Sequence, residues 1–159
     1  MEPVDPEVLE VFERSLERCG RDRTFLDRFY ERFLASSPKV EEKFAETDFE
    51  HQKRALRASF HVLLLAAEDP ESPGAREYLE HLAQRHSASE MDIGAELYDL
   101  WLDSLLETVR ESDPEFDSGI EEAWEDVMGV GIRFLVSRYR SIPEGGSLEN
   151  DHSYQEERR

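Results

Sequence analysis

The sequence predicts an all-α fold of roughly six or seven helices. Apolar residues recur at spacings of three and four along most of the chain, the period of a helix face packed on a core. Prolines and glycines separate these stretches, as expected of short connections. No stretch alternates like a β-strand, and no internal repeat or coiled-coil heptad is present. We therefore expect broad apolar helix faces around one core.

The predicted helices follow these apolar stripes in order. The long ones cover residues 6–19, 22–35, 49–67, 75–86, 93–112 and 116–140. A short helical turn follows Pro38. Asp5 and Asp48 suit the N-cap position of the helices they precede, and Gly20 suits a helix end. Residues 1–140 are thus expected to form one domain, followed by a polar, charged tail over 141–159 that we expect to be disordered.

Composition excludes several classes of partner. The 159 residues include 38 acidic and 19 basic side chains, a net charge of −19, so nucleic acid and anionic membranes are poor partners. Cys19 is the single cysteine and lies on an apolar stripe, where we expect a buried, unreactive thiol. The chain shows no signal peptide and no apolar run of membrane-spanning length. A cytoplasmic protein is expected.

Three polar residues lie on or beside apolar helix faces: Tyr30, Gln52 and His86. His86 shares a face with Leu82, one turn earlier, whereas His81 falls on the solvent side. Each of the three could be an isolated core residue whose polar atom finds a backbone partner. A cofactor held between the helices would explain them together, because a lone histidine on an apolar helix face is what haem iron uses as a proximal ligand.

A series of short blocks occurs in a characteristic order along the chain. They are Phe29-Tyr30-Glu31-Arg32-Phe33, Ser37-Pro38, Phe44, Gln52-Lys53-Arg54-Ala55-Leu56, Leu82-Ala83-Gln84-Arg85-His86, Ile93-Gly94-Ala95-Glu96-Leu97-Tyr98, Leu105-Leu106, Ala123-Trp124 and Gly129-Val130. In this order and spacing they resemble the globins, especially the bacterial single-domain globins and the globin domain of flavohaemoglobins. The likeness runs from about residue 5 to 140. It implies a globin fold, with six to eight helices around a haem pocket.

On the proximal side the resemblance makes His86 the iron ligand of haem b, with Leu82 one turn before it. The Nδ1–H of His86 is expected to bond the Leu82 carbonyl. Tyr98 matches the second polar residue that the family places on this side. Where flavohaemoglobins have a glutamate near the histidine, this chain has Tyr139, which we expect to make at best one neutral hydrogen bond. That loss argues against a dedicated nitric-oxide dioxygenase or peroxidase.

On the distal side the resemblance makes Tyr30 and Gln52 the hydrogen-bonding pair that faces a bound gas. Leu56 would pack above the iron, and Phe44 would stack on the porphyrin. His51 remains an alternative to Gln52, because the corner before it looks short and its register could slip by one residue.

The resemblance implies reversible binding of oxygen or another diatomic gas, NO or CO, at ferrous haem. Two donors facing bound oxygen imply slow release, which suits a scavenger, sensor or redox protein better than a bulk carrier. The chain ends at Arg159 without flavin or nicotinamide domains, so reduction is expected to need an external reductase. Two alternatives stay open: a nitric-oxide dioxygenase working with a separate reductase, and a haem-free globin-like interaction module. The oligomeric state stays open as well.

Overall fold

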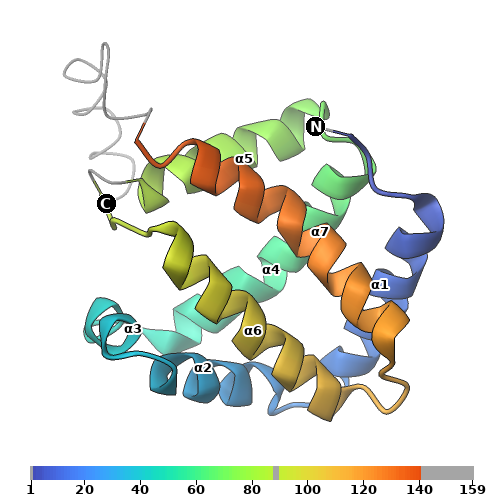
Figure 1. Cartoon of the computed structure of the whole chain (residues 1–159), viewed down its shortest axis with the longest axis horizontal. Coiled ribbons are helices and arrows are strands. Elements are labelled where there is room, and N and C mark those ends of the chain that lie inside the picture. The colour runs from blue at the N-terminus through green and yellow to red at the C-terminus, as the bar shows by residue number, and fades with distance from the viewer. Residues whose placement is uncertain (1, 88–89, 141–159) are drawn as a thin grey trace.

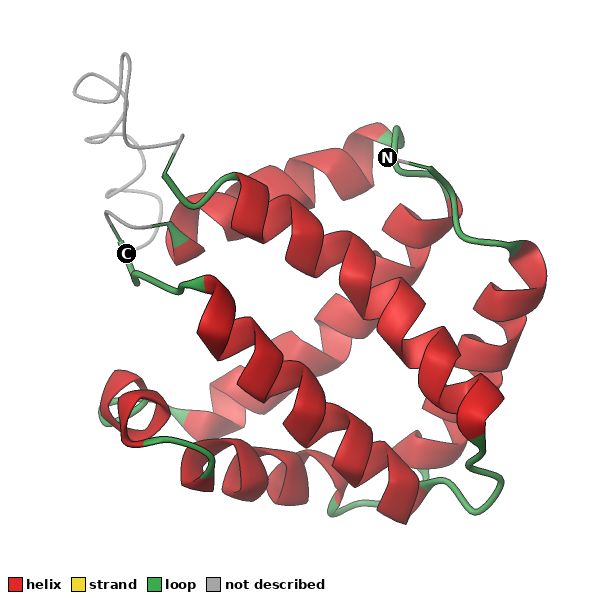
Figure 2. Cartoon of the chain, viewed as in Figure 1, coloured by secondary structure: helices red, strands yellow, loops and turns green. Residues whose placement is uncertain are grey.

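The computed structural model describes residues 2–87 and 90–140, which form seven α-helices and no strand. The helices are α1 (Pro6–Gly20), α2 (Phe25–Ala35), α3 (Pro38–Lys43), α4 (Phe49–Glu68), α5 (Pro73–His86), α6 (Ala95–Ser112) and α7 (Ser118–Ser137) (Figures 1 and 2). The all-α prediction is confirmed for these residues. The tail predicted over 141–159 lies outside them.

The predicted caps set where the helices begin. The Asp5 carboxylate accepts a hydrogen bond from the backbone of Glu7 (2.8 Å), and the Asp48 carboxylate accepts one from the backbone of Glu50 (3.1 Å). Both are N-caps as expected. Several predicted ends were wrong by two or three residues: α2 begins at Phe25 instead of residue 22, α6 begins at Ala95 instead of 93, and α7 ends at Ser137 instead of 140. The starts of α5 and α7 also differ from the predicted ones by two residues.

The helices pack in two crossing layers. In Figure 1, α6 and α7 run antiparallel across the front, and α4 crosses behind them. α1 packs on α7, α2 packs on α6, and α5 contacts both α4 and α7. None of the helices in the described part of the chain is both long and apolar enough to cross a membrane.

One end of the core is densely filled around Trp124. This Trp124 cluster combines the indole with the rings of Phe12, Phe25 and Phe60, whose centroids lie 4.8, 6.4 and 5.6 Å away. Cys19 is fully buried in the same core, and burial raises the pKa of its thiol to about 12. The expectation of a buried thiol is therefore confirmed, and the raised pKa agrees with an unreactive one. The other end of the core, bordered by α3 and α5, holds the cavity described next.

Candidate functional site

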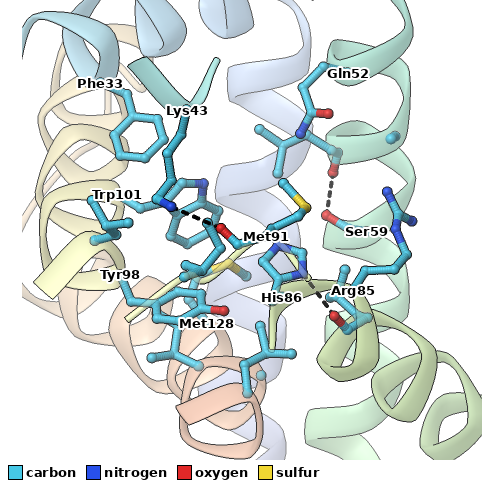
Figure 3. A pocket seen from close by; sticks show the side chains of 18 of the residues that line it. Phe33, Lys43, Gln52, Ser59, Arg85, His86, Met91, Tyr98, Trp101 and Met128 are labelled. Atoms are coloured by element: carbon cyan, nitrogen blue, oxygen red, sulfur yellow. Dashed lines mark hydrogen bonds between the residues drawn. The ribbon is translucent and has the colours of Figure 1, made fainter. Parts of the chain in front are cut away.

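A cavity of about 180 Å³ lies between α2, α3, α4, α5, α6 and α7 (Figure 3). The structure brings all the residues that the sequence nominated onto its wall: Tyr30, Phe44, Gln52, Leu56, Leu82, His86 and Tyr98. They come from five segments that are far apart in sequence. The wall is mostly apolar, and a few polar groups converge on it, the usual make-up of a small-molecule or cofactor site.

His86 is the last residue of α5 and is half-buried at the cavity wall. Its Nδ1 lies 2.8 Å from the carbonyl oxygen of Leu82, one turn earlier, as predicted. Because a carbonyl can only accept, Nδ1 carries the proton and Nε2 keeps its lone pair. Burial lowers the pKa of His86, although the bond to the Leu82 carbonyl raises it in part. The ring is therefore a neutral imidazole, the form that ligates a metal.

Tyr30 and Gln52 meet on another wall of the cavity. Tyr30 is buried on α2, and burial raises the pKa of its phenol to about 12, partly offset by a hydrogen bond with the Gln52 side chain. Because Asp48 caps α4, Gln52 shares the cavity face of that helix with Leu56, one turn later. His51 is exposed and does not line the cavity. The structure therefore puts Gln52, and not His51, beside Tyr30.

An aromatic wall closes the cavity on the side of α3. Phe44 follows the last residue of α3, and its ring lies 5.7 Å from Phe33, 6.1 Å from Phe49 and 6.3 Å from Tyr30, measured between ring centroids. Such contacts hold an aromatic ring in place without closing its free face to a ligand. Phe44 is half-buried, so part of its surface remains open for stacking.

Tyr98 brings a phenol to the side of the cavity that holds His86. Its ring lies 6.3 Å from the His86 ring, with the two planes 28° apart. The Tyr98 hydroxyl is buried, has no hydrogen-bond partner among the described residues, and its burial raises the pKa of Tyr98. A buried polar group without a partner is unusual in a folded protein and calls for a physical explanation.

Sequence reasoning missed several residues of the wall. Lys43 and Arg85 bring two cationic side chains to it, and the Lys43 ammonium donates a hydrogen bond to the carbonyl of Met91 (2.9 Å). Ser59 and Tyr78 add hydroxyls. Tyr78 lies eight residues before His86, about two helical turns, so its place on the same face could have been inferred. No local signal distinguishes Lys43 or Arg85 from the other surface cations.

Tyr139 takes a different partner from the one its sequence position suggested. It lies two residues beyond the end of α7, and its hydroxyl donates a hydrogen bond to the carboxylate of Asp92. The expectation of a neutral hydrogen bond was therefore wrong. The His86 ring instead contacts the Leu82 carbonyl and the Tyr98 ring.

Comparison with known proteins points to one family. The globin family model matches residues 27–133. Among solved structures, the chain is similar to a protein from Pseudomonas aeruginosa PAO1 that is described as structurally highly homologous to a human hemoglobin. The two share 41% sequence identity over 84% of this chain and 98% of that one, with a TM-score of 0.78. No curated protein sequence matches the chain.

Proposed function

The chain belongs to the globin family, as its sequence predicted, and from this premise we propose that it holds haem b in the cavity and reversibly binds oxygen or another diatomic gas there. One observation carries the proposal: a neutral His86 and the Tyr30–Gln52 pair occupy different walls of the same cavity. Globins hold haem by such a combination, in which an imidazole binds the iron and distal hydrogen-bond donors face the gas.

The residues of the cavity wall fit haem b. Nε2 of His86 is left for the iron because Nδ1 already donates to the Leu82 carbonyl. Leu56, Leu82 and Phe44 offer apolar surface to a flat macrocycle. Lys43 and Arg85, also on the wall, suit the two carboxylates that haem carries. Bound there, haem would supply a ferrous centre for the gas, and the protein would supply its orientation and its polar surroundings.

The Tyr30–Gln52 pair would set how long oxygen stays. The haem would supply a site at which oxygen carries partial negative charge, and there the Tyr30 hydroxyl and the Gln52 amide could each donate a hydrogen bond. A hydrogen bond to a charged acceptor contributes about 1.5–3 kcal/mol, roughly a tenfold to hundredfold gain in affinity. Two such donors favour slow release, which suits a scavenger, sensor or redox protein.

The surroundings of His86 favour ligand binding over oxygen activation. The partner of its Nδ1–H is a neutral carbonyl, which makes the imidazole a weaker electron donor than a carboxylate partner would. A nitric-oxide dioxygenase working with a separate reductase is the second candidate, and the Tyr30–Gln52 pair is compatible with it. Turnover of nitric oxide by the haem-loaded protein with an added reductase would favour this candidate, whereas simple ligand exchange would favour reversible binding.

An absorption spectrum after addition of haem tests the proposal. We expect a Soret band in the wild type and a displaced, weakened band in His86→Ala, because the iron loses its protein ligand. His81→Ala is the matched control, since His81 is an exposed histidine on the same helix. The absence of a Soret band in the wild type would refute haem binding and leave a haem-free module. A His86→Ala spectrum identical to that of the wild type would refute ligation by His86.

A further inference from the structure

The residues that follow His86 complete the helix that carries it. The last carbonyl groups of a helix have no partner within it. At the end of α5, the Met91 amide donates to the Arg85 carbonyl (3.2 Å), and the Ile93 amide donates to the His86 carbonyl (3.1 Å). Residues 91–93 therefore cap the end of α5, and we refer to them as the α5 cap.

The direction of the His86 ring depends on that helix end. Its Nδ1 is bonded to the Leu82 carbonyl within the last turn of α5, so the ring is oriented by backbone from Leu82 to His86. A shift of the α5 cap would alter the backbone of this turn. It would thereby alter where Nε2 points.

Two side chains from other elements hold the α5 cap. Lys43, at the end of α3, donates to the Met91 carbonyl (2.9 Å). Tyr139, just beyond α7, donates to the Asp92 carboxylate. In Figure 1 the ends of α5 and α7 lie on the same side of the molecule. The bond between Tyr139 and Asp92 therefore joins two helix ends that are far apart in sequence.

Asp92 has a backbone conformation that its surroundings must hold. Its φ is 54°, in the left-handed region that side-chain-bearing residues rarely adopt. Such a residue persists when nearby contacts over-determine it, and these residues cluster at functional sites. Here the contacts are the bond from Tyr139 and a hydrogen bond from the Asp92 amide to the Ser87 carbonyl (2.9 Å).

We propose that Tyr139 is a positioning residue for His86. By holding Asp92, the Tyr139 hydroxyl fixes the α5 cap and with it the direction of His86 Nε2. The part of this proposal that concerns iron rests on the proposed function. Tyr139 thus acts on the proximal side through the backbone, at the sequence position where flavohaemoglobins have a glutamate near the histidine.

Hydrogen exchange of the haem-free protein tests the cap. We expect the amides of Asp92 and Ile93 to exchange roughly three- to tenfold faster in Tyr139→Phe, the change expected from losing one hydrogen bond to a charged group at the surface. Arg140→Gln is the matched control. The Arg140 guanidinium carbon lies 5.3 Å from the centre of the Tyr139 ring, and the substitution leaves the Tyr139 hydroxyl intact. In Asp92→Asn the exchange rates of these amides should lie between those of Tyr139→Phe and Arg140→Gln. Unchanged exchange in Tyr139→Phe would overturn the proposal.

The haem-loaded protein tests the positioning. We expect the iron–histidine stretching band in the resonance Raman spectrum to shift or broaden in Tyr139→Phe and to stay unchanged in Arg140→Gln. If amide exchange is faster in Tyr139→Phe but the iron–histidine band does not change, the bond from Tyr139 to Asp92 stabilises only the α5 cap. That result would overturn the positioning role. If the wild type gives no iron–histidine band at all, the ligation of iron by His86 in the proposed function fails. The exchange experiment still decides whether Tyr139 holds the α5 cap.

Discussion

The Trp124 cluster and the cavity sit at opposite ends of one core and differ in how their polar groups are satisfied. In the Trp124 cluster the indole Nε1 donates to Ser15 Oγ (2.8 Å), and Ser15 donates to Asp113 (2.6 Å). Arg18 completes the group with two bonds to Asp113 (2.6 and 3.0 Å). At the cavity, the Tyr98 hydroxyl is buried without a partner among the described residues.

The difference separates the end that stabilises the fold from the end at which we propose that a ligand binds. At the Trp124 end, the side chains are closely packed and the polar groups bond one another without any added group. These contacts stabilise the folded chain. The half-buried His86, the open face of Phe44 and the Tyr98 hydroxyl, which has no partner among the described residues, contribute little to that stability. We expect the proposed ligand to contact them. Substitutions at the two ends should therefore separate into effects on folding and effects on binding.

The largest effect on folding is expected from Trp124→Ala. Trp124 is fully buried against three aromatic rings, so its removal leaves a large cavity and deprives Ser15 of a donor. We expect a loss of about 3–5 kcal/mol in the free energy of unfolding, measured by urea denaturation of the haem-free protein. Trp101→Ala is the control, because Trp101 is half-buried and already lines the cavity. Equal losses in the two variants would contradict the division of the core.

Asp113 should make the Trp124 end sensitive to acid. Burial alone would raise the pKa of Asp113, but hydrogen bonds from Arg18 and Ser15 outweigh it and hold the pKa below its usual value. A lowered folded-state pKa contributes stability above the unfolded-state pKa of about 3.9, and this contribution is lost as pH falls through the folded-state value.

Comparison of the wild type with Asp113→Asn measures that contribution. We expect the variant to be less stable by roughly 3 kcal/mol at pH 7, because Arg18 loses a buried charged partner. The gap should narrow as the pH falls below about 4, because the unfolded wild type then binds a proton at Asp113 that the folded wild type does not yet bind; it should be smallest below the lowered folded-state pKa. A gap of equal size at pH 7 and pH 3 would show that the charge of Asp113 is not what stabilises this end.

At the cavity, Tyr30→Phe should act on binding and leave folding nearly unchanged. It removes one hydroxyl next to Gln52 and keeps the buried ring. We expect oxygen to dissociate about tenfold to a hundredfold faster, measured by stopped flow on the haem-loaded protein. Tyr78→Phe is the control for loss of a cavity hydroxyl elsewhere on the wall. An unchanged dissociation rate in Tyr30→Phe would remove the proposed role of this residue.

Local sequence signals accounted for most of the fold. Apolar spacing predicted the helices, and Asp5 and Asp48 predicted two of their starts, because both signals act within a few residues. The late start of α6 was not predictable from its own segment. The Ile93 amide bonds the His86 carbonyl, so a contact made by α5 decides the conformation there.

The candidate site likewise contains features that local sequence signals predict and features that depend on distant contacts. Spacing along single helices put His86 and Leu82 on one face, and the family resemblance supplied the remaining wall residues that were predicted. Neither signal indicated Lys43 or Arg85. The partner of Tyr139 could not be inferred, because it depends on a left-handed Asp92 in a loop 47 residues away in sequence. The Ser15–Asp113 bond joins residues 98 apart for the same reason: only the packed helices bring them together.

Removing a single hydroxyl at each end gives the smallest and most direct test. Ser15→Ala leaves the Trp124 Nε1 and Asp113 each short of a partner, and we expect a loss of about 1–3 kcal/mol in the free energy of unfolding. Tyr98→Phe removes a buried hydroxyl without a described partner, and the haem-free protein should be unchanged or more stable by up to about 1 kcal/mol. Urea denaturation of both variants measures whether each substitution lowers or raises the free energy of unfolding. A clear loss in Tyr98→Phe would mean that its hydroxyl is already satisfied, for instance by a bound water, and that the cavity end is as complete as the Trp124 end.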